Sequence, residues 1–163
     1  MRKLWNRIFA WLLVALTLWA IPAAADSPAP AVRTFSLSRT GTSTWQARSY
    51  RIIETARGRF AWIELYDCNT IVLPITDEEM ADFSALIAEL NLSDWNGFCE
   101  TDPDTLDGES FSLAATFAEG SMLSAYGANR FPEDYGNRAA RVEEFFWLLM
   151  ASWEIHLESE FLK

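Results

Sequence analysis

The chain has 163 residues, half of them hydrophobic, and 23 acidic against 13 basic residues give it a formal net charge of −10 at pH 7. This length suits one domain with a hydrophobic core. The acidic balance argues against nucleic acid and anionic lipid as partners, because both are themselves negatively charged.

The first 25 residues have the pattern of a cleavable secretory signal peptide. A positive start precedes an apolar run over residues 8–21, and Pro22 ends that run. Small alanines follow, which places the expected cleavage between Ala25 and Asp26. The positive residues are Arg2, Lys3 and Arg7.

The apolar run is too short for a membrane anchor. Fourteen residues span about 21 Å of helix, less than the roughly 30 Å core of a bilayer. We therefore expect the mature chain to be exported without a membrane span, to the periplasm or the extracellular space. The compact signal suggests a bacterial source.

Removal of the signal leaves 10 basic and 23 acidic residues, and these are unevenly distributed. Six arginines lie between Arg33 and Arg59, whereas residues 60–129 hold 14 acids and no basic residue. Two interpretations stay open: a solvated surface that keeps the protein soluble, or a surface for a cationic envelope partner or a divalent cation. Apposition of the two parts in the fold would cancel most of the asymmetry.

The mature chain has two cysteines, Cys68 and Cys99. In an oxidising compartment, an isolated pair predicts a disulfide. A bridge across some 31 residues would contribute about 3 to 4 kcal/mol in the chain-entropy model. The spacing fits neither a C-x-x-C redox motif nor a zinc knuckle.

The first part of the mature chain predicts three strands. Residues 26–32, rich in proline and alanine, are expected to form a flexible tether. Alternating apolar and polar residues then predict strands over 33–39, 48–55 and 59–66. Arg57 and Gly58 are expected to join the last two as a tight hairpin.

A helix is predicted over residues 77–90. Thr76 and Glu79 form a capping box, in which each side chain takes a backbone N–H at the helix start. The apolar residues Met80, Phe83, Ile87 and Leu90 then recur at steps of three and four, typical of one buried helix face.

The second half predicts a hairpin and a closing helix. Residues 109–118 alternate strictly, and Glu119 and Gly120 form a turn. A primed turn would place Phe117 across from Met122 and Leu113 across from Tyr126, giving one apolar sheet face. A helix over residues 138–155 follows, because Ala139, Val142, Phe146, Leu149 and Trp153 recur at helical spacing.

The elements in order predict an α+β domain over residues 33–157. We expect an antiparallel sheet of about five strands in the order βββαββα, with two amphipathic helices packed on it and one disulfide. Residues 158–163 would form a C-terminal tail.

The segment Gly127–Tyr135 has the pattern G-x-N-x-x-P-x-x-Y. Gly127 is expected to take a positive φ where the strand ends, and Asn129 a left-handed position. Around it, residues 105–153 resemble small exported bacterial domains and lipoproteins of uncharacterised function, with a hairpin, this motif and a closing helix. The resemblance implies the fold and no particular activity.

The segment 101–109 is a weak calcium candidate. Its four carboxylates and a glycine bend are ligand types that calcium uses. The EF-hand pattern fails, because Leu106 takes a ligand position and Asp107 replaces the required glycine. An acidic loop that ends in a turn is the alternative. The carboxylates are Asp102, Asp104, Asp107 and Glu109.

The catalytic residue sets of common enzymes are missing from the sequence. His156 is the single histidine, and neither a G-x-S-x-G nor a phosphate-binding loop motif occurs. Some pair of the 23 acids could still serve acid–base hydrolysis, but the sequence selects none.

The sequence therefore favours an exported, non-enzymatic binding protein of the cell envelope, with a protein or cationic partner. A hydrolase that uses Asp and Glu, or a calcium-dependent structural domain, is the alternative. Apart from that calcium, we expect no cofactor, and the sequence predicts no oligomeric state.

Overall fold

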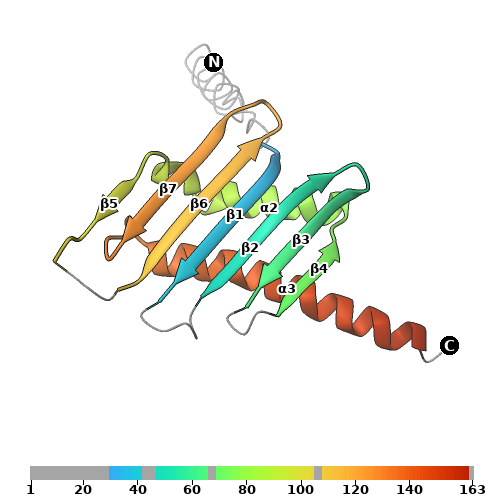
Figure 1. Cartoon of the computed structure of the whole chain (residues 1–163). Helices are drawn as coiled ribbons and strands as arrows, with labels where there is room; N and C mark the ends of the chain where they lie inside the picture. Colours follow the sequence, from blue (N-terminus) through green and yellow to red (C-terminus); the bar gives the residue numbers. More distant parts are fainter. Residues whose placement is uncertain (1–29, 42–46, 66–68, 105–107, 162–163) are drawn as a thin grey trace, which may run out of the picture.

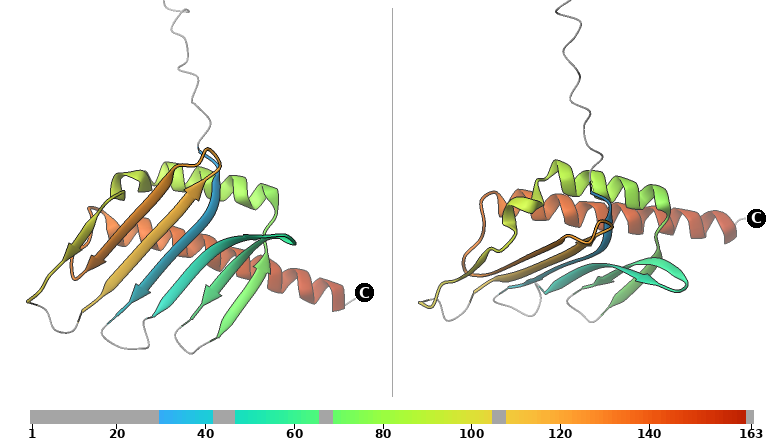
Figure 2. Two further views of the ribbon diagram at one scale, coloured as in Figure 1. Left: turned by 45° about the horizontal axis from the view of Figure 1, so that its top comes forward. Right: turned by 90° about the horizontal axis from the view of Figure 1, so that it is seen from above.

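The computed structural model describes residues 30–41, 47–65, 69–104 and 108–161. These residues form a seven-stranded sheet in the order β4-β3-β2-β1-β6-β7-β5 and two α-helices. Both helices lie on one side of the sheet (Figures 1 and 2). The elements are β1 (Val32–Thr40), β2 (Arg48–Thr55), β3 (Gly58–Glu64), β4 (Thr70–Pro74), α2 (Asp77–Glu89), the 3-10 helix η2 (Leu92–Trp95), β5 (Cys99–Thr101), β6 (Ser110–Phe117), β7 (Met122–Ala128) and α3 (Tyr135–Phe161).

The α+β class is confirmed, but the predicted strand count is wrong. β4 and β5 add one strand to each edge of the five expected ones. β5 pairs with β7 in parallel, so the sheet is mixed rather than antiparallel. The predicted signal peptide, with Ala25 and Asp26, lies outside the described residues, and so does most of the predicted tether.

The core lies between the sheet and the helices. Phe35 and Leu37 on β1 face the helices, and Phe83 of α2 and Phe146 of α3 meet them from the other side. The rings of Phe35 and Phe83 are 4.9 Å apart, centroid to centroid, in an edge-to-face arrangement. The sequence alternation in β1 therefore reports which face is buried.

The register of the β6–β7 hairpin differs from the prediction by one residue. Thr116 pairs with Met122, and Leu113 pairs with Ala125. A shift of one residue moves side chains to the opposite face of a sheet. Met122 and Tyr126 consequently lie away from the core, with 70% and 43% of their surface exposed.

α2 begins as the capping box predicts. The N–H of Glu79 donates to the Thr76 hydroxyl at 3.2 Å, and the N–H of Thr76 donates to the Glu79 carboxylate at 2.7 Å. Met80, Phe83 and Ile87 of the predicted stripe are buried against the sheet.

α3 begins at Tyr135, earlier than predicted, and continues to Phe161. It passes across the sheet and extends beyond the β4 edge (Figure 1). Asp134, directly before it, has a φ of 57°, and Asn129 has a φ of 55° as expected.

Position 127 requires a glycine because there is no room for a side chain, and not because of its φ angle. A Cβ atom there would lie 2.1 Å from the Arg130 carbonyl and 2.6 Å from the Phe111 ring. The glycines with positive φ in the described part of the chain are Gly58, Gly97 and Gly120, so the expectation of a positive φ at Gly127 is wrong.

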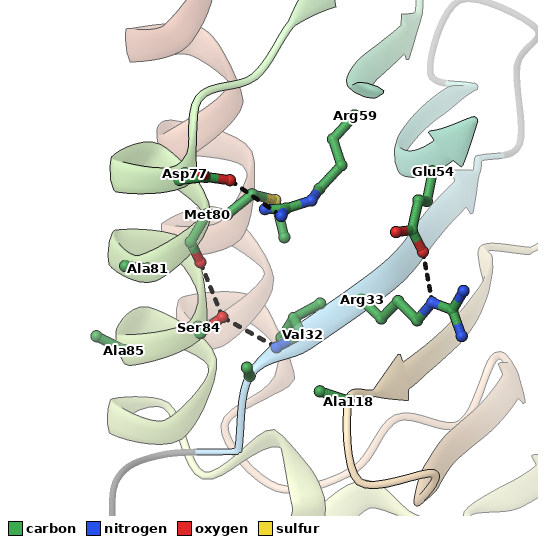
Figure 3. A pocket seen from close by; sticks show the side chains of 11 residues that line it. Val32, Arg33, Glu54, Arg59, Asp77, Met80, Ala81, Ser84, Ala85 and Ala118 are labelled. Carbon is green, nitrogen blue, oxygen red and sulfur yellow. Dashed lines mark hydrogen bonds and ion pairs between the residues drawn. The ribbon is translucent and has the colours of Figure 1, made fainter. Parts of the chain in front are cut away.

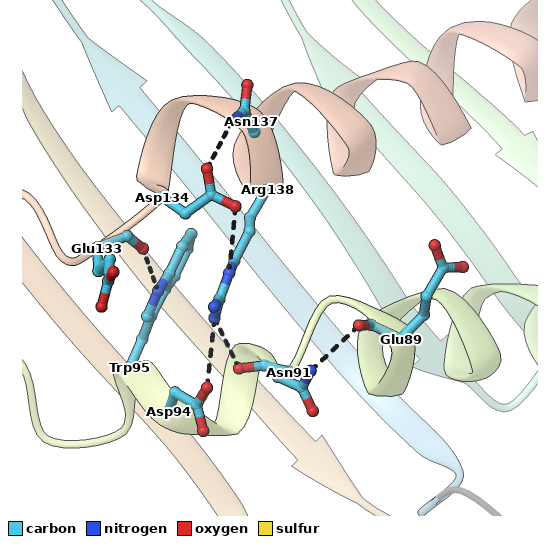
Figure 4. A network of polar contacts seen from close by, with 8 residues as sticks. All are labelled: Glu89, Asn91, Asp94, Trp95, Glu133, Asp134, Asn137 and Arg138. Carbon is cyan, nitrogen blue, oxygen red and sulfur yellow. Dashed lines mark hydrogen bonds and ion pairs between the residues drawn. The ribbon is translucent and has the colours of Figure 1, made fainter.

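A polar network fixes the start of α3 to the corner between α2 and η2 (Figure 4). Arg138 donates to the Asn91 carbonyl at 3.0 Å and lies 3.6 Å from the Asp94 carboxylate. Its guanidinium also covers the Trp95 ring, 5.8 Å from the centroid. Trp95 in turn donates to the Glu133 carbonyl at 3.3 Å. These contacts hold the corner together.

The structure does not support the predicted disulfide. Cys99 is an exposed free thiol on β5, at one edge of the sheet. Cys68 lies outside the described residues, but its neighbour Asn69 directly precedes β4, at the other edge. Six strand spacings of about 4.8 Å separate those edges, whereas the Cα atoms of a disulfide are about 5.5 Å apart.

Within the described residues, neither helix combines the length and the apolar composition that crossing a membrane requires.

Candidate functional site

A cleft of about 730 Å³ lies between α2 and the start of β1 (Figure 3). The β2–β3 hairpin contributes Glu54 and Arg59, and the turn after β6 contributes Ala118. Four separate segments of the chain therefore meet at this cleft. Its volume is in the range of small-ligand sites.

One wall of the cleft is a stripe along α2. Met80 and Ser84 point toward the start of β1, whereas Ala81 and Ala85, which also line the cleft, lie on the outer side of the helix and are exposed (Figure 3). The short alanine side chains leave room beside the helix, and Met80 is a flexible apolar contact. Val32 closes the cleft from the β1 side, so the interior is mostly apolar.

Ser84 fixes this wall to the sheet. Its hydroxyl donates to the Met80 carbonyl at 2.8 Å and accepts from the Val32 N–H at 3.0 Å. Both hydrogen bonds are buried. The hydroxyl is thus used for structure, and no described group beside it would activate it as a nucleophile.

Two ion pairs border the apolar interior. Arg59 reaches across to Asp77, with 3.0 Å between Nη2 and Oδ1. Arg33 binds Glu54 through its Nε, and this hydrogen bond lowers the pKa of the Glu54 carboxyl. Figure 3 shows the two pairs on different sides of Val32. The cleft therefore presents both positive and negative groups.

Both ion pairs can be opened by a competing ligand. The side chain of Asp77 is 94% exposed and that of Arg33 is 65% exposed. Such surface pairs contribute little to stability, because water screens their charges. A ligand with charged groups of its own could replace either partner at little cost.

A second polar cluster is buried between the sheet and α3. Glu143 accepts from Arg39 at 2.7 Å and from Arg48 at 3.2 Å. The residue is 7% exposed, although it carries a charge. The sequence contains a signal for it, since Glu143 lies directly beside Val142 on the apolar stripe of the last helix.

Two tyrosines lie next to this cluster with buried hydroxyls. Neither the Tyr50 nor the Tyr135 hydroxyl has a hydrogen-bond partner among the described residues. Burial raises the pKa of Tyr135 to about 12, and it also raises the pKa of Tyr50. The Arg39 guanidinium covers the Tyr135 ring at 5.5 Å. Since the Glu143 carboxylate is buried and already bound by both arginines, we interpret the cluster as structural.

The structure does not group the calcium candidates that it describes, Asp102, Asp104 and Glu109, and the calcium site stays a prediction. The N–H of Asp104 donates to the Asp102 carboxylate at 3.1 Å, a local turn contact. Glu109 is exposed, and Asp107 lies outside the described residues. Over the described ranges, no three His, Cys, Asp or Glu side chains are grouped to hold a metal ion.

The acids of residues 60–129 that pair with the arginine-rich strands lie at different places in the fold. Glu64 lies on the sheet and pairs with Arg51 at 3.1 Å, while Asp77 borders the cleft and pairs with Arg59. Arg33, Arg39 and Arg48 instead pair with acids outside that stretch. The arginine-rich strands thus neutralise only part of the acidic middle.

The comparisons with known proteins leave the chain without an assigned relative. No protein-family model matches it, and neither a curated protein nor a solved structure is significantly similar to it. The resemblance of residues 105–153 to small exported bacterial domains therefore stays a prediction.

Proposed function

We propose that the mature chain is an exported, non-enzymatic binding protein of the cell envelope whose cleft between α2 and the start of β1 takes a short peptide. The proposal rests on the cleft, where two accessible ion pairs border an apolar interior. The signal-peptide pattern of residues 1–25 supports the location.

The chemistry of the cleft favours a zwitterionic ligand. Arg59 and Arg33 can bind a carboxylate, while Asp77 and Glu54 can bind an ammonium group. Alanine-sized ligand side chains would contact Met80 and the alanines of α2. A purely anionic ligand is disfavoured by the two carboxylates and by the net charge of the chain.

The proposal can be tested by titrating the mature protein with trialanine. We expect chemical-shift changes in NMR spectra at the backbone amides of β1, α2 and the β2–β3 hairpin. Acetylation and amidation of the peptide termini remove both charges, so the blocked peptide should bind at least tenfold more weakly.

Arg59→Ala should weaken binding of trialanine by about tenfold, because it removes a guanidinium at the cleft. Arg57→Ala is the matched control, since Arg57 lies on the exposed hairpin turn two residues away and does not line the cleft. Equal binding by both variants, or shifts confined to other parts of the chain, would rule out the cleft as the peptide site.

A further inference from the structure

At the cleft, the neighbouring strands β1 and β2 separate. Their antiparallel pairing ends at Phe35 and Ile52. Both strands extend beyond this point, since β1 begins at Val32 and β2 ends at Thr55. Figure 2 shows the start of β1 and the β2–β3 hairpin diverging. Each strand therefore has a short segment at the cleft that is not paired with the other.

The start of β1 is held away from β2 by other contacts. Its register with β6 shifts between Val32 and Thr34, and a bulge of this kind bends a strand. The Ala31 carbonyl accepts from the Ala118 N–H at 2.9 Å. The Val32 N–H donates to the Ser84 hydroxyl at 3.0 Å. Because these backbone groups are bound to the turn after β6 and to α2, the separation from β2 is built into the fold.

Glu54 presents its backbone N–H and C=O to this separation. It lies opposite Arg59 in the pairing of β2 with β3. The Arg59 carbonyl accepts from the Ile75 N–H at 3.0 Å, on the side away from β2. Glu54 and Arg59 are thus a non-hydrogen-bonded pair, whose members direct their backbone groups away from each other. Those of Glu54 point toward β1, where the pairing of the two strands has already ended.

An ion pair of side chains spans the separation in place of a backbone pair. Arg33 of β1 binds the Glu54 carboxylate through its Nε, and both residues line the cleft. Their side chains are 65% and 39% exposed, respectively. A ligand that enters the cleft from solvent can therefore reach the Glu54 backbone.

We infer that a peptide binds in the cleft as an extended strand, through hydrogen bonds between its main chain and the backbone of Glu54. The inference rests on the proposed function and specifies how that peptide is recognised. The central residue of a tripeptide has an N–H and a C=O on the same side, and these match the two groups of Glu54 in an antiparallel pair. Addition of a strand to free backbone groups is an established mode of peptide recognition.

Recognition of the main chain selects a class of peptides and not one sequence. Every residue except proline offers the same backbone hydrogen bonds, because proline has no N–H. The length is limited at one end, since β1 and β2 are paired from Phe35 and Ile52 onward. The cleft should therefore take short peptides of varied sequence, and it should reject proline or an N-methylated residue at the position opposite Glu54.

Two methylated forms of trialanine test the inference in a calorimetric titration of the mature protein. N-methylation of the second residue removes the N–H that would bind the Glu54 carbonyl, and it should weaken binding by about tenfold. N-methylation of the third residue is the matched control. It adds the same group and keeps both terminal charges, but its N–H points to the other side of an extended strand, so we expect almost the affinity of trialanine.

Hydrogen exchange measured by NMR reports on Glu54 directly. Saturating trialanine should slow the exchange of the Glu54 N–H by about tenfold, because the bound peptide protects it. The Val72 N–H is the control. Val72 lies opposite Trp62 on the edge strand β4, and by the same alternation its backbone groups point away from the sheet. Val72 does not line the cleft, so its exchange should stay unchanged.

The outcomes separate the inference from the proposed function. If trialanine binds in the cleft but the two methylated peptides bind equally well, or if exchange of the Glu54 N–H is unchanged, the inference is wrong and the charged termini alone hold the peptide. If trialanine itself does not bind, the proposed function is wrong, and the inference is wrong with it.

Discussion

Glu143 is the charged residue with the strongest structural role in the described part of the chain. α3 carries it into the interface with the sheet, where each carboxylate oxygen accepts from an arginine. Removing one partner of such a buried cluster is costly, because the remaining charges lose their counterion while they stay partly desolvated. The cluster thereby fixes α3 against the ends of β1 and β2.

Glu143→Gln should therefore lower the free energy of unfolding by about 2 to 3 kcal/mol, measured by urea denaturation. The partial exposure of Arg39 and Arg48 keeps the loss from being larger. Glu144→Gln is the matched control: its side chain is 62% exposed, and we expect a change within about 0.5 kcal/mol. Similar losses in both variants would contradict the structural role of Glu143.

Tyr135 should make the stability of the protein sensitive to alkaline pH. Burial raises its pKa to about 12, above the value of about 10 for an unfolded chain. Below pH 10 the hydroxyl is protonated in both states. As the pH rises from 10 to 12, the unfolded chain loses this proton first, so stability falls by about 2 to 3 kcal/mol.

Urea unfolding at pH 9.5 and pH 11.5 checks this effect. Tyr135→Phe should lose less stability between the two pH values than the unchanged protein, because it lacks the titrating hydroxyl. Tyr126→Phe, on the exposed side of β7, should behave like the unchanged protein. The interpretation fails if the Tyr135 and Tyr126 variants show the same dependence.

At the scale of elements, one hydroxyl connects α2 to the sheet. Ser84→Ala removes the acceptor of the buried Val32 N–H. An unsatisfied buried donor costs about 1 to 3 kcal/mol, so we expect a loss of this size in urea unfolding. Hydrogen exchange at Val32 should also become faster. Ser93→Ala, at an exposed position of η2, serves as the control and should leave both measurements unchanged.

The elements that sequence predicted well are those with local signals. The capping box at Thr76 and Glu79 places the start of α2, because cap, first turn and apolar stripe lie within one segment. β4 and β5 were missed for the opposite reason. β5 has three exposed residues without alternation, and its place is set by parallel pairing with β7.

In the β6–β7 hairpin, an error of one residue in the predicted register assigned exposed side chains to the buried face of the sheet. Alternation in Ser110–Phe117 identifies the buried side of β6 correctly. The turn adds one residue relative to the expected two-residue loop, since the N–H of Phe117 donates to the Ser121 carbonyl. Met122 and Tyr126 were therefore assigned to the wrong face. Turn geometry, which the sequence determines only weakly, decides the register.

At the scale of the whole molecule, the cleft could not be predicted from sequence. Its lining comes from β1, the β2–β3 hairpin, α2 and the turn after β6, and consists mainly of alanines and paired arginines. Neither residue type has a distinctive spacing. The uneven distribution of arginines and acids was visible, but which of them meet depends on the strand order.

The opposite positions of β4 and β5 lead to a prediction about the thiols. A reducing agent should leave the free energy of unfolding of the mature protein unchanged, and Cys99→Ser should change it by less than about 0.5 kcal/mol. Peptide mapping without reduction should yield no Cys68–Cys99 peptide from a single chain. A loss of about 3 to 4 kcal/mol on reduction would instead restore the disulfide.

The central position of β1 also has a kinetic consequence. The strand that comes first in the chain pairs with β6, and the hydroxyls of Thr34 and Thr116 join residues 82 positions apart. The edge of β1 that pairs with β6 therefore stays unpaired until residues 110–117 have been synthesised. Such high contact order slows folding. Late completion of the sheet would suit the export proposed above, because a chain passes through a narrow translocation channel only while it is unfolded.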